Sequence, residues 1–250
     1  EEGSPLIVLS ERLRNRVQEK TSLPIALAMR YGNPSIKKGL QELADQKVDE
    51  VLLIPLYPQF AMATTETIIV MAESLRKEYF PDMYFTTLPA FYNHKDYIRV
   101  LSSSIQEALQ GKEWKHLLFS YHGVPERHIR KSDITKSHCK MDGKCCFKDS
   151  PAHQYCYRHQ CEITTTQVAA YLGLKPETYS TSFQSRLGLD PWLQPYTDKT
   201  VENFAKSGTK KMAIVTPAFV SDCLETLEEI AMEAKEEFCE TGGDDFHVVP

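Results

Sequence analysis

The sequence predicts an α/β protein whose parallel sheets are flanked by helices. Segments with helical periodicity alternate with short apolar runs along almost the whole chain, as in folds where each strand is followed by a helix. The chain has 250 residues, of which 42% are hydrophobic, and this suffices for one large or two medium cores. Because the alternation is too long for one mononucleotide-binding unit, we expect two similar halves, residues 1–111 and 112–250.

The first half contains four helical and three strand patterns. Leu6, Leu9, Leu13 and Val17 mark the opening helix by their spacing. Short apolar runs predict strands at 23–29, 51–54 and 83–87, and amphipathic segments predict helices at 35–46, 65–79 and 96–109.

The second half continues this order around a long insertion. Strands are expected at 117–120, 179–183, 212–215 and at the end of the sequence, with helices at 163–172, 200–206 and from Asp222 onward. Residues 123–159 read as loop, with a cysteine-rich insertion at about 126–161. A loop of this length inside a domain normally needs something to order it.

Charge and motifs narrow the partners. The net charge is −5 without a sustained basic stripe, which argues against nucleic acid. No apolar run approaches the roughly 18–20 residues of a membrane span, and peripheral attachment through a loop stays open. Neither a Gly-x-Gly-x-x-Gly fingerprint nor a phosphate-binding Gly-Lys-Ser/Thr loop occurs. The expected strand ends carry aromatic and proline residues, which suits a large, flat, apolar ligand.

His122 is the first candidate for chemistry. It stands in Ser120-Tyr121-His122-Gly123-Val124-Pro125, directly after the apolar run 117–119. Ligands of open parallel sheets bind at the carboxyl ends of the strands, and histidine accepts and releases protons near neutral pH. A structural, hydrogen-bonded histidine is the plainer alternative.

A row of acids on the late helix is the second candidate. Asp222, Glu225, Glu229, Glu233 and Glu236 fall on the side opposite the apolar stripe. In the plainer interpretation, Asp222 caps the helix, Glu225 completes a capping box, and the remaining acids form a solvated face. In the functional one, the acids pass Fe²⁺ or protons along the helix.

Two polar segments are candidates for ligand contacts. Gln184, Ser185 and Arg186 precede a loop that contains Trp192, which either packs in the core or stacks on a ligand plane. Arg30 ends a predicted strand, as a surface charge or as the partner of a carboxylate.

Five of the seven cysteines lie close together, as Cys139-x5-Cys145-Cys146-x9-Cys156-x4-Cys161. An odd, clustered set argues against a secreted disulfide framework and for a metal site in a reducing compartment. Four thiolates would hold zinc or a [2Fe–2S] cluster, and His138, His153 and His159 keep zinc credible. The spacing does not say which cysteine is the spare one; Cys145 or Cys146 is the suspected extra residue, because the two are adjacent.

These segments together resemble the ferrochelatase family, whose members insert ferrous iron into a porphyrin. The resemblance extends through residues 3–6 (GSPL), 28–32 (AMRYG), 55–60 (PLYPQF), 64–65 (TT), 120–125 (SYHGVP), 183–186 (FQSR), 191–197 (PWLQPYT) and 220–230 (VSDCLETLEEI). It implies two Rossmann-like halves with a porphyrin cleft between them. It also implies a lyase of haem biosynthesis that acts on protoporphyrin IX or coproporphyrin III.

The resemblance also implies roles for single residues. His122 matches the family histidine that takes pyrrole protons or contacts the iron, Glu225 the acid across the cleft, and Glu229 the acid behind it. His122 and Glu225 are thus the expected contacts for the Fe²⁺ substrate. The expected porphyrin contacts are Arg30, Tyr31, Tyr57, Gln184, Ser185, Arg186 and Trp192.

Three departures from the family pattern accompany the resemblance. Cys223 stands where some members have histidine, the opening strand and closing helices of the family are missing, and a cysteine insertion is present. Because some relatives carry a [2Fe–2S] cluster on such a segment, we favour that cluster over zinc. We expect a cytoplasmic protein, with contact to the periphery of the inner membrane left open. The rival functions are a cobalt or sirohydrochlorin chelatase and a haem-binding or iron–sulfur sensor without turnover.

Overall fold

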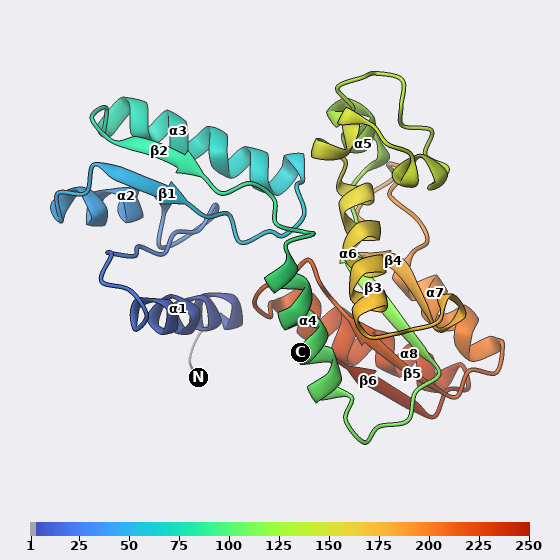
Figure 1. Ribbon diagram of the computed structural model, residues 1–250. Coiled ribbons are helices and arrows are strands. Elements are labelled where there is room, and N and C mark those ends of the chain that lie inside the picture. Colours follow the sequence, from blue (N-terminus) through green and yellow to red (C-terminus); the bar gives the residue numbers. More distant parts are fainter. Residues whose placement is uncertain (1–3) are drawn as a thin grey trace. The chain divides into compact units, whose positions relative to one another are not determined.

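Helices and parallel strands alternate along the computed structural model, which describes residues 4–250 (Figure 1). Gly3 of the resemblance lies outside the described residues. The contacts divide the chain into two units, one running to Tyr57 and including Ala61–Ala90, the other comprising Pro58–Phe60 and Phe91–Pro250. The boundary between two similar halves at residues 111 and 112 stays a prediction. The contacts place the helix that precedes this boundary, Lys95–Ala108, in the second unit.

The first unit is built around two parallel strands, β1 (Glu50–Leu53) and β2 (Tyr84–Thr87). Its helices are α1 (Pro5–Gln18), α2 (Ile36–Asp45), the π-helical turn η1 (Met62–Glu66) and α3 (Thr67–Tyr79). The Ser35 hydroxyl accepts a hydrogen bond from the Lys38 amide and so caps α2. Ile36, Leu40 and Leu43 of α2 are buried with Ala72, Phe80 and Met83, and this cluster is the core of the unit.

The expected strand at residues 23–29 does not form. Leu23 is 69% exposed, and the segment makes only an isolated bridge between Met29 and Ser35. Neither β1 nor β2 pairs with it, and these two strands form the only sheet that the described part of this unit contains. An apolar run without a neighbouring strand stays extended but is not a strand.

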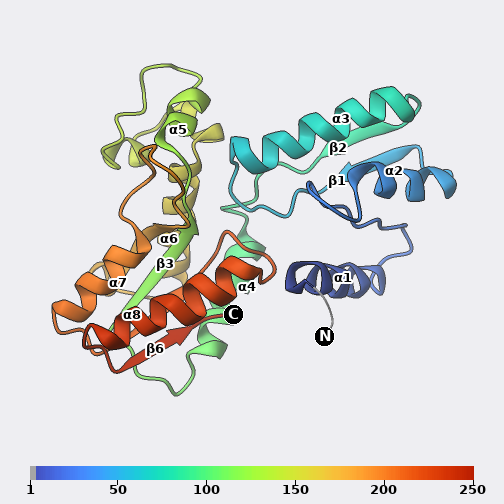
Figure 2. The same cartoon turned by 180° about the vertical axis from the view of Figure 1, so that it is seen from behind.

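The second unit contains a four-stranded parallel sheet in the order β4-β3-β5-β6. The strands are β3 (His116–His122), β4 (Tyr179–Gln184), β5 (Lys211–Val215) and β6 (Asp245–Val248). Helices α4 (Lys95–Ala108) and α6 (Tyr157–Tyr171) contact each other on one side of the sheet. Helix α7 (Thr197–Lys206), the π-helix η5 (Glu225–Ala234) and α8 (Lys235–Glu240) cover the other (Figures 1 and 2).

The central strand β3 fixes the two faces of this sheet. Tyr121 points to α6, where its hydroxyl lies 2.9 Å from that of Thr165, and Ser120 points to α7, 2.7 Å from the Thr197 hydroxyl. Since side chains alternate along a strand, His122 shares the α7 side with Ser120. That side holds the main core, formed by Leu118, Val201, Ala205, Met212, Ile214, Ile230, Ala234, Phe238 and Phe246.

The cysteine-rich insertion has more regular structure than the sequence predicts. It contains α5 (Glu126–Ser132) and two 3₁₀ turns, η2 (Lys144–Phe147) and η3 (Pro151–Tyr155), and a further 3₁₀ turn, η4 (Pro176–Thr178), precedes β4. Helix α6 begins at Tyr157, before the expected start at residue 163. The Cys156 thiol caps its first turn, and residues 157–162 carry no apolar stripe that would mark them as helical.

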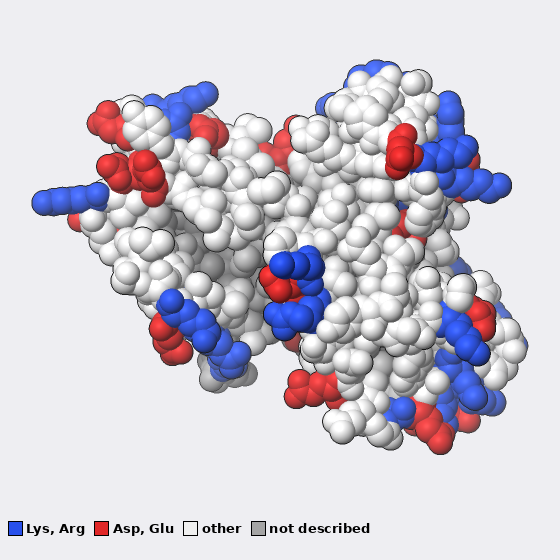
Figure 3. All heavy atoms as spheres, in the orientation of Figure 1, with Lys and Arg blue, Asp and Glu red and all other residues white. Residues whose placement is uncertain are grey.

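Both signs of charge share the surface. On the face drawn in Figure 3, Lys and Arg are interspersed with Asp and Glu. Lys211, for example, lies 2.9 Å from Glu113 and 3.3 Å from Asp245. None of the helices within residues 4–250 combines the length and apolar composition that a membrane span requires.

Candidate functional site

The carboxyl edge of the second unit's sheet places His122 beside the polar segment that follows β4. His122 is in register with Gln184, the last residue of β4, and the Gly123 amide donates to the Gln184 carbonyl at 2.7 Å. Because parallel strands end at the same edge, the segments after β3, β4 and β5 converge there.

The hydrogen bond of the His122 ring defines its tautomer. Nδ1 lies 2.6 Å from the Gly123 carbonyl oxygen. A carbonyl only accepts, so Nδ1 carries the proton and donates it. In the neutral ring, Nε2 therefore holds a lone pair, and the ring is arranged as a base or a metal ligand through Nε2.

Two aromatic rings flank the imidazole. The ring centroids of Trp192 and Phe219 lie 6.4 and 6.3 Å from that of His122. Trp192 packs closely on Gly123, where an added Cβ would lie 3.2 Å from the indole and 2.8 Å from the Gln184 carbonyl oxygen. The Trp192 indole N–H is buried and has no hydrogen-bond partner among residues 4–250. This donor is therefore shielded from solvent and makes no hydrogen bond with the described part of the chain.

Glu225 is held in its ionised form near His122. A hydrogen bond from the Cys223 thiol lowers its pKa, and burial opposes that effect. The backbone amide of Glu225 and, when protonated, the His122 ring add to the lowering. Burial and the neighbouring carboxylate raise the pKa of Cys223 to about 11, so this thiol stays neutral and donates. A carboxylate near an imidazole is a suitable pair for moving protons or for holding Fe²⁺ weakly.

Glu229 is bound to the segment after β4. Its Oε1 accepts from the Ser185 amide at 2.7 Å, and its Oε2 accepts from the Ser185 hydroxyl. Ser185 has a φ of +63°, a left-handed conformation that costs energy for a residue with a side chain. The two hydrogen bonds stabilise that conformation, so Glu229 holds Ser185 in place.

The helix that carries these acids differs from the expected one. Residues Glu225–Ala234 form a π-helix, in which hydrogen bonds join residues five apart. The capping box does not form, because Asp222 accepts from the Thr226 hydroxyl at 2.9 Å and the helix begins after it. Glu233 and Glu236 are exposed, as the solvated-face interpretation has it.

The remaining predicted contacts are divided between the units. Gln184 is buried and accepts from the Ser120 hydroxyl at 2.6 Å, whereas Arg186 lies 3.5 Å from Asp198 and stacks on Tyr196. Three residues lie in the first unit: Arg30, which stacks on Tyr31 at 4.5 Å, exposed Tyr31 itself, and exposed Tyr57. The contacts of Arg30, Tyr31 and Tyr57 with a porphyrin stay predictions.

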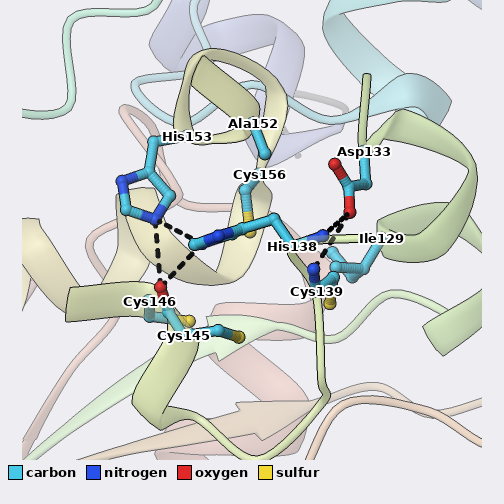
Figure 4. A pocket seen from close by; sticks show the side chains of 9 residues that line it. All are labelled: Ile129, Asp133, His138, Cys139, Cys145, Cys146, Ala152, His153 and Cys156. Carbon is cyan, nitrogen blue, oxygen red and sulfur yellow. Dashed lines mark hydrogen bonds between the residues drawn. The ribbon is translucent and has the colours of Figure 1, made fainter. Parts of the chain in front are cut away.

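Four of the five clustered cysteines line one small pocket. Cys139, Cys145, Cys146 and Cys156 face it together with Ile129, Asp133, His138, Ala152 and His153 (Figure 4). Cys161 does not line this pocket; it is fully buried on α6, where its thiol is hydrogen-bonded to Tyr157. The structure thus separates Cys161 from the other four.

Side-chain to backbone hydrogen bonds shape the pocket. Asp133 accepts from the amides of Cys139 and His138 at 2.9 and 3.0 Å. Burial alone would raise the pKa of Asp133, but these bonds and two from Thr135 lower it to about 2. The rings of His138 and His153 donate to the Cys145 carbonyl, and His159 donates to that of Cys146. These histidines therefore orient the backbone of the cysteines.

The thiols interact with one another. A hydrogen bond from Cys146 lowers the pKa of Cys156 to about 7, against the effect of burial, and the same bond raises the pKa of Cys146. All seven cysteines are free thiols. Within residues 4–250, no group of three or more His, Cys, Asp or Glu side chains has the arrangement that holds a metal ion. The pocket thus brings together four thiols, the kind of donor that zinc and iron–sulfur sites use.

Two residues of these sites escape the sequence analysis. Asp133 carries a signal, because Asp-x-Thr is a common start of a turn in which the aspartate accepts backbone amides. Tyr157 carries only its position directly after Cys156. Phe219 is one of the aromatic residues at the expected strand ends, and the sequence indicates no specific role for it.

Comparison with known proteins places the chain in a family. The family model Ferrochelatase matches residues 1–250. The chain is 46% identical over 252 residues to a protein named ferrochelatase from Ectopseudomonas mendocina and covers 74% of its length; the corresponding values for the ferrochelatase of Opitutus terrae are 42% and 72%. Both alignments cover 100% of this chain.

The fold also matches solved structures. SirB from Bacillus subtilis with Fe³⁺ has a TM-score of 0.61 at 12% identity, with 100% of this chain and 84% of the other covered. The sirohydrochlorin chelatase SirB from subspecies spizizenii, in complex with cobalt, has a TM-score of 0.62 at 9% identity, with coverages of 96% and 80%. These structures confirm the α/β fold class. The family model matches residues 1–250 and the curated relatives are 42–46% identical over the whole chain, so the chain belongs to the ferrochelatase family.

Proposed function

We propose that His122 is the base, and Glu225 the facing carboxylate, with which this ferrochelatase-family lyase inserts ferrous iron into a porphyrin in haem biosynthesis. The observation that carries the proposal is the ring geometry of His122. The Nδ1–H group donates a hydrogen bond to the Gly123 carbonyl, so the Nε2 lone pair is available to the substrate.

The reaction exchanges two pyrrole N–H protons for one Fe²⁺ ion. His122 Nε2 accepts a proton from the porphyrin and passes it on, so that the base is regenerated for the second one. Glu225, kept ionised beside Cys223 and His122, offers the departing protons an acceptor and the entering iron an oxygen ligand. One imidazole and one carboxylate bind Fe²⁺ weakly enough to release it to the ring.

Binding of the porphyrin is assigned to the residues that the resemblance implies. Trp192 offers a flat ring and an unpartnered indole N–H beside His122, and Glu229 holds Ser185 at the same edge. Arg186 is exposed and its ion pair with Asp198 is weak enough to yield to a propionate. We propose Arg30, Tyr31, Tyr57 and Gln184 as further porphyrin contacts.

The test is the replacement His122→Ala. We expect iron insertion to fall by about 10²–10⁴-fold, as for loss of a general base, while porphyrin affinity measured by fluorescence quenching stays within about threefold. The matched control is His94→Asn, an exposed histidine whose capping of α4 asparagine can replace. Near-normal turnover of His122→Ala under anaerobic conditions would refute the assignment.

We further propose that Cys139, Cys145, Cys146 and Cys156 hold a [2Fe–2S] cluster. The donor set supports this, because four thiols face one pocket and the nearby histidines are engaged with backbone carbonyls. Such a group supplies one-electron redox chemistry or a structural cross-link. An EPR spectrum with iron, sulfide and zinc counts distinguishes it from a four-cysteine zinc site.

The free thiols also support a cytoplasmic location. Seven unpaired cysteines fit a reducing compartment, where thiols persist and clusters assemble. Cell fractionation tests this placement and any peripheral contact with the inner membrane.

A further inference from the structure

The cysteine pocket and His122 are connected by one buried hydroxyl. The Tyr157 hydroxyl donates to the backbone carbonyl of His122 at 2.8 Å. Tyr157 is the first residue of α6, and Cys156, which lines the cysteine pocket, immediately precedes it as the cap of that helix. A single residue thus contacts the backbone of the proposed base from the boundary of the cysteine-rich segment.

Tyr157 is held firmly in this position. Its side chain is 6% exposed, and its hydroxyl also takes part in a hydrogen bond with the thiol of Cys161. Burial raises the pKa of Tyr157, so the hydroxyl keeps its proton and remains a donor. The Cys156 thiol accepts from the His159 amide at 3.5 Å and fixes the start of the helix. The place of Tyr157 therefore depends on the order of the segment that Cys156 ends.

The hydrogen bond from Tyr157 lies one peptide away from the carbonyl that selects the His122 tautomer. The His122 carbonyl belongs to the peptide between His122 and Gly123, and the next carbonyl, that of Gly123, accepts the Nδ1 proton at 2.6 Å. The Gly123 amide in turn donates to the Gln184 carbonyl at 2.7 Å. Tyr157 and Gln184 thus hold the two polar groups of the peptide that joins His122 to Gly123, and so restrain the backbone on one side of the carbonyl that accepts the Nδ1 proton.

We propose that Tyr157 is a positioning residue for iron insertion, and that its hydroxyl couples the order of the cysteine-rich segment to the tautomer of His122. The proposal rests on the proposed role of His122 as base. Without the hydroxyl, the peptide loses one of its two restraints, and the Gly123 carbonyl no longer holds the Nδ1 proton in place. The proton then distributes over both ring nitrogens, and Nε2 is less often available as the base.

The experiment replaces Tyr157 by phenylalanine, which keeps the ring and removes the hydroxyl. The control is Tyr171→Phe, on the same helix and 53% exposed. We expect Tyr157→Phe to lower kcat about five- to tenfold, the usual effect of one such hydrogen bond, with KM for the porphyrin within twofold. Tyr171→Phe should change neither value.

The second readout is independent of turnover. In protein labelled with ¹⁵N at histidine, the ring nitrogens of His122 are assigned by their loss in His122→Ala. Their shifts then report which nitrogen carries the proton. The fraction protonated at Nδ1 should fall in Tyr157→Phe and in Cys156→Ala, which lacks the acceptor for the His159 amide. The double variant should show no further fall, because both changes act through the same contact.

The outcomes separate this proposal from the one it rests on. Unchanged kcat in Tyr157→Phe, a change confined to KM, or an unaltered ¹⁵N spectrum would each overturn the role of Tyr157, while loss of turnover in His122→Ala would leave the base assigned. Additive ¹⁵N changes in the double variant would overturn the coupling. If His122→Ala keeps its turnover, the proposed function itself fails.

Discussion

The strand-end site around His122 and the cysteine pocket are held together in different ways. His122 ends a strand whose residues Leu117, Leu118 and Phe119 are completely buried, and sheet hydrogen bonds fix its register. The pocket lies among short helical turns, and its shape comes from side chains such as Asp133 and His138 bonded to the backbone. The first site is preorganised by a core, whereas the second depends on local polar contacts and on what its thiols bind.

The largest expected effect concerns the cysteines. Replacing Cys139, Cys145, Cys146 or Cys156 singly by serine should remove the bound iron and sulfide of the purified protein almost completely, because serine is a poor ligand for the cluster. Cys161→Ala should retain both, since Cys161 lies outside the pocket. Iron and sulfide assays with the visible spectrum measure this difference.

The exposed Cys239 provides the control, because it lies on α8 and lines no part of the pocket. Cys239→Ser should keep the iron and sulfide content of the parent protein. Loss of the cluster in Cys161→Ala, with full retention in one of the four pocket variants, would refute the separation that the structure makes. In that event, the thiol-lined pocket would not be the cluster site.

A smaller effect is expected in the strand-end site itself. Glu229→Gln leaves only one carbonyl oxygen for the two donors of Ser185, whose left-handed backbone then loses a restraint. We expect a loss of about 1–3 kcal/mol in the free energy of unfolding, together with about a tenfold fall in kcat. Urea unfolding and steady-state kinetics measure the two quantities.

The effects of Glu229→Gln on kcat and on the free energy of unfolding together distinguish two roles for Glu229. A group that only relays protons would lower kcat and leave unfolding unchanged, whereas a group that holds Ser185 changes both. The exposed Glu233, on the same π-helix, is the control. Glu233→Gln should change the free energy of unfolding by no more than about 0.5 kcal/mol and leave kcat within about twofold. Equal effects of the two replacements would mean that Glu229 is only part of the solvated face of the helix.

The place of His122 at a strand end could be predicted from the sequence, because the signals for it are local. An apolar run followed by Ser120-Tyr121-His122-Gly123 marks a strand end, and the structure places a strand there that includes His122. The contact between Glu229 and Ser185 could not be predicted, since the two residues are far apart in sequence and meet only once η5 packs on the sheet. The expected strand at 23–29 failed for a similar reason, because an apolar run does not reveal whether a partner strand exists.

The cysteine pocket was predictable in composition and not in arrangement. The spacing indicated four ligands and a spare, with Cys145 or Cys146 as the suspected extra residue because they are adjacent. In the structure both line the pocket, and Cys161 is directed toward Tyr157 instead. The direction of a side chain on a helix depends on where that helix begins, and the early start of α6 at Tyr157 has no sequence signal.

The smallest effect tests whether polar contacts alone shape the pocket. Asp133 is 5% exposed. Burial raises its pKa, but the hydrogen bonds that it accepts from backbone amides and a hydroxyl lower the pKa from an ordinary 3.8 to about 2. A carboxylate whose pKa is depressed on folding adds stability above its unfolded pKa and loses it as the pH falls through the folded one. Asp133 should therefore contribute about 2 kcal/mol at pH 7 and progressively less between pH 4 and pH 2.

Asp133→Asn removes this contribution, because the amide nitrogen cannot accept from the backbone of Cys139 or His138. The variant should be less stable than the parent by about 2 kcal/mol at pH 7, and the difference should narrow at pH 3, as followed by urea unfolding. Asp149→Asn, an exposed acid in the same segment, should show no such dependence. If the Asp133→Asn difference is the same at both pH values, the pocket does not depend on the ionised carboxylate. The contrast between a site preorganised by a core and one shaped by polar contacts would then no longer hold for Asp133.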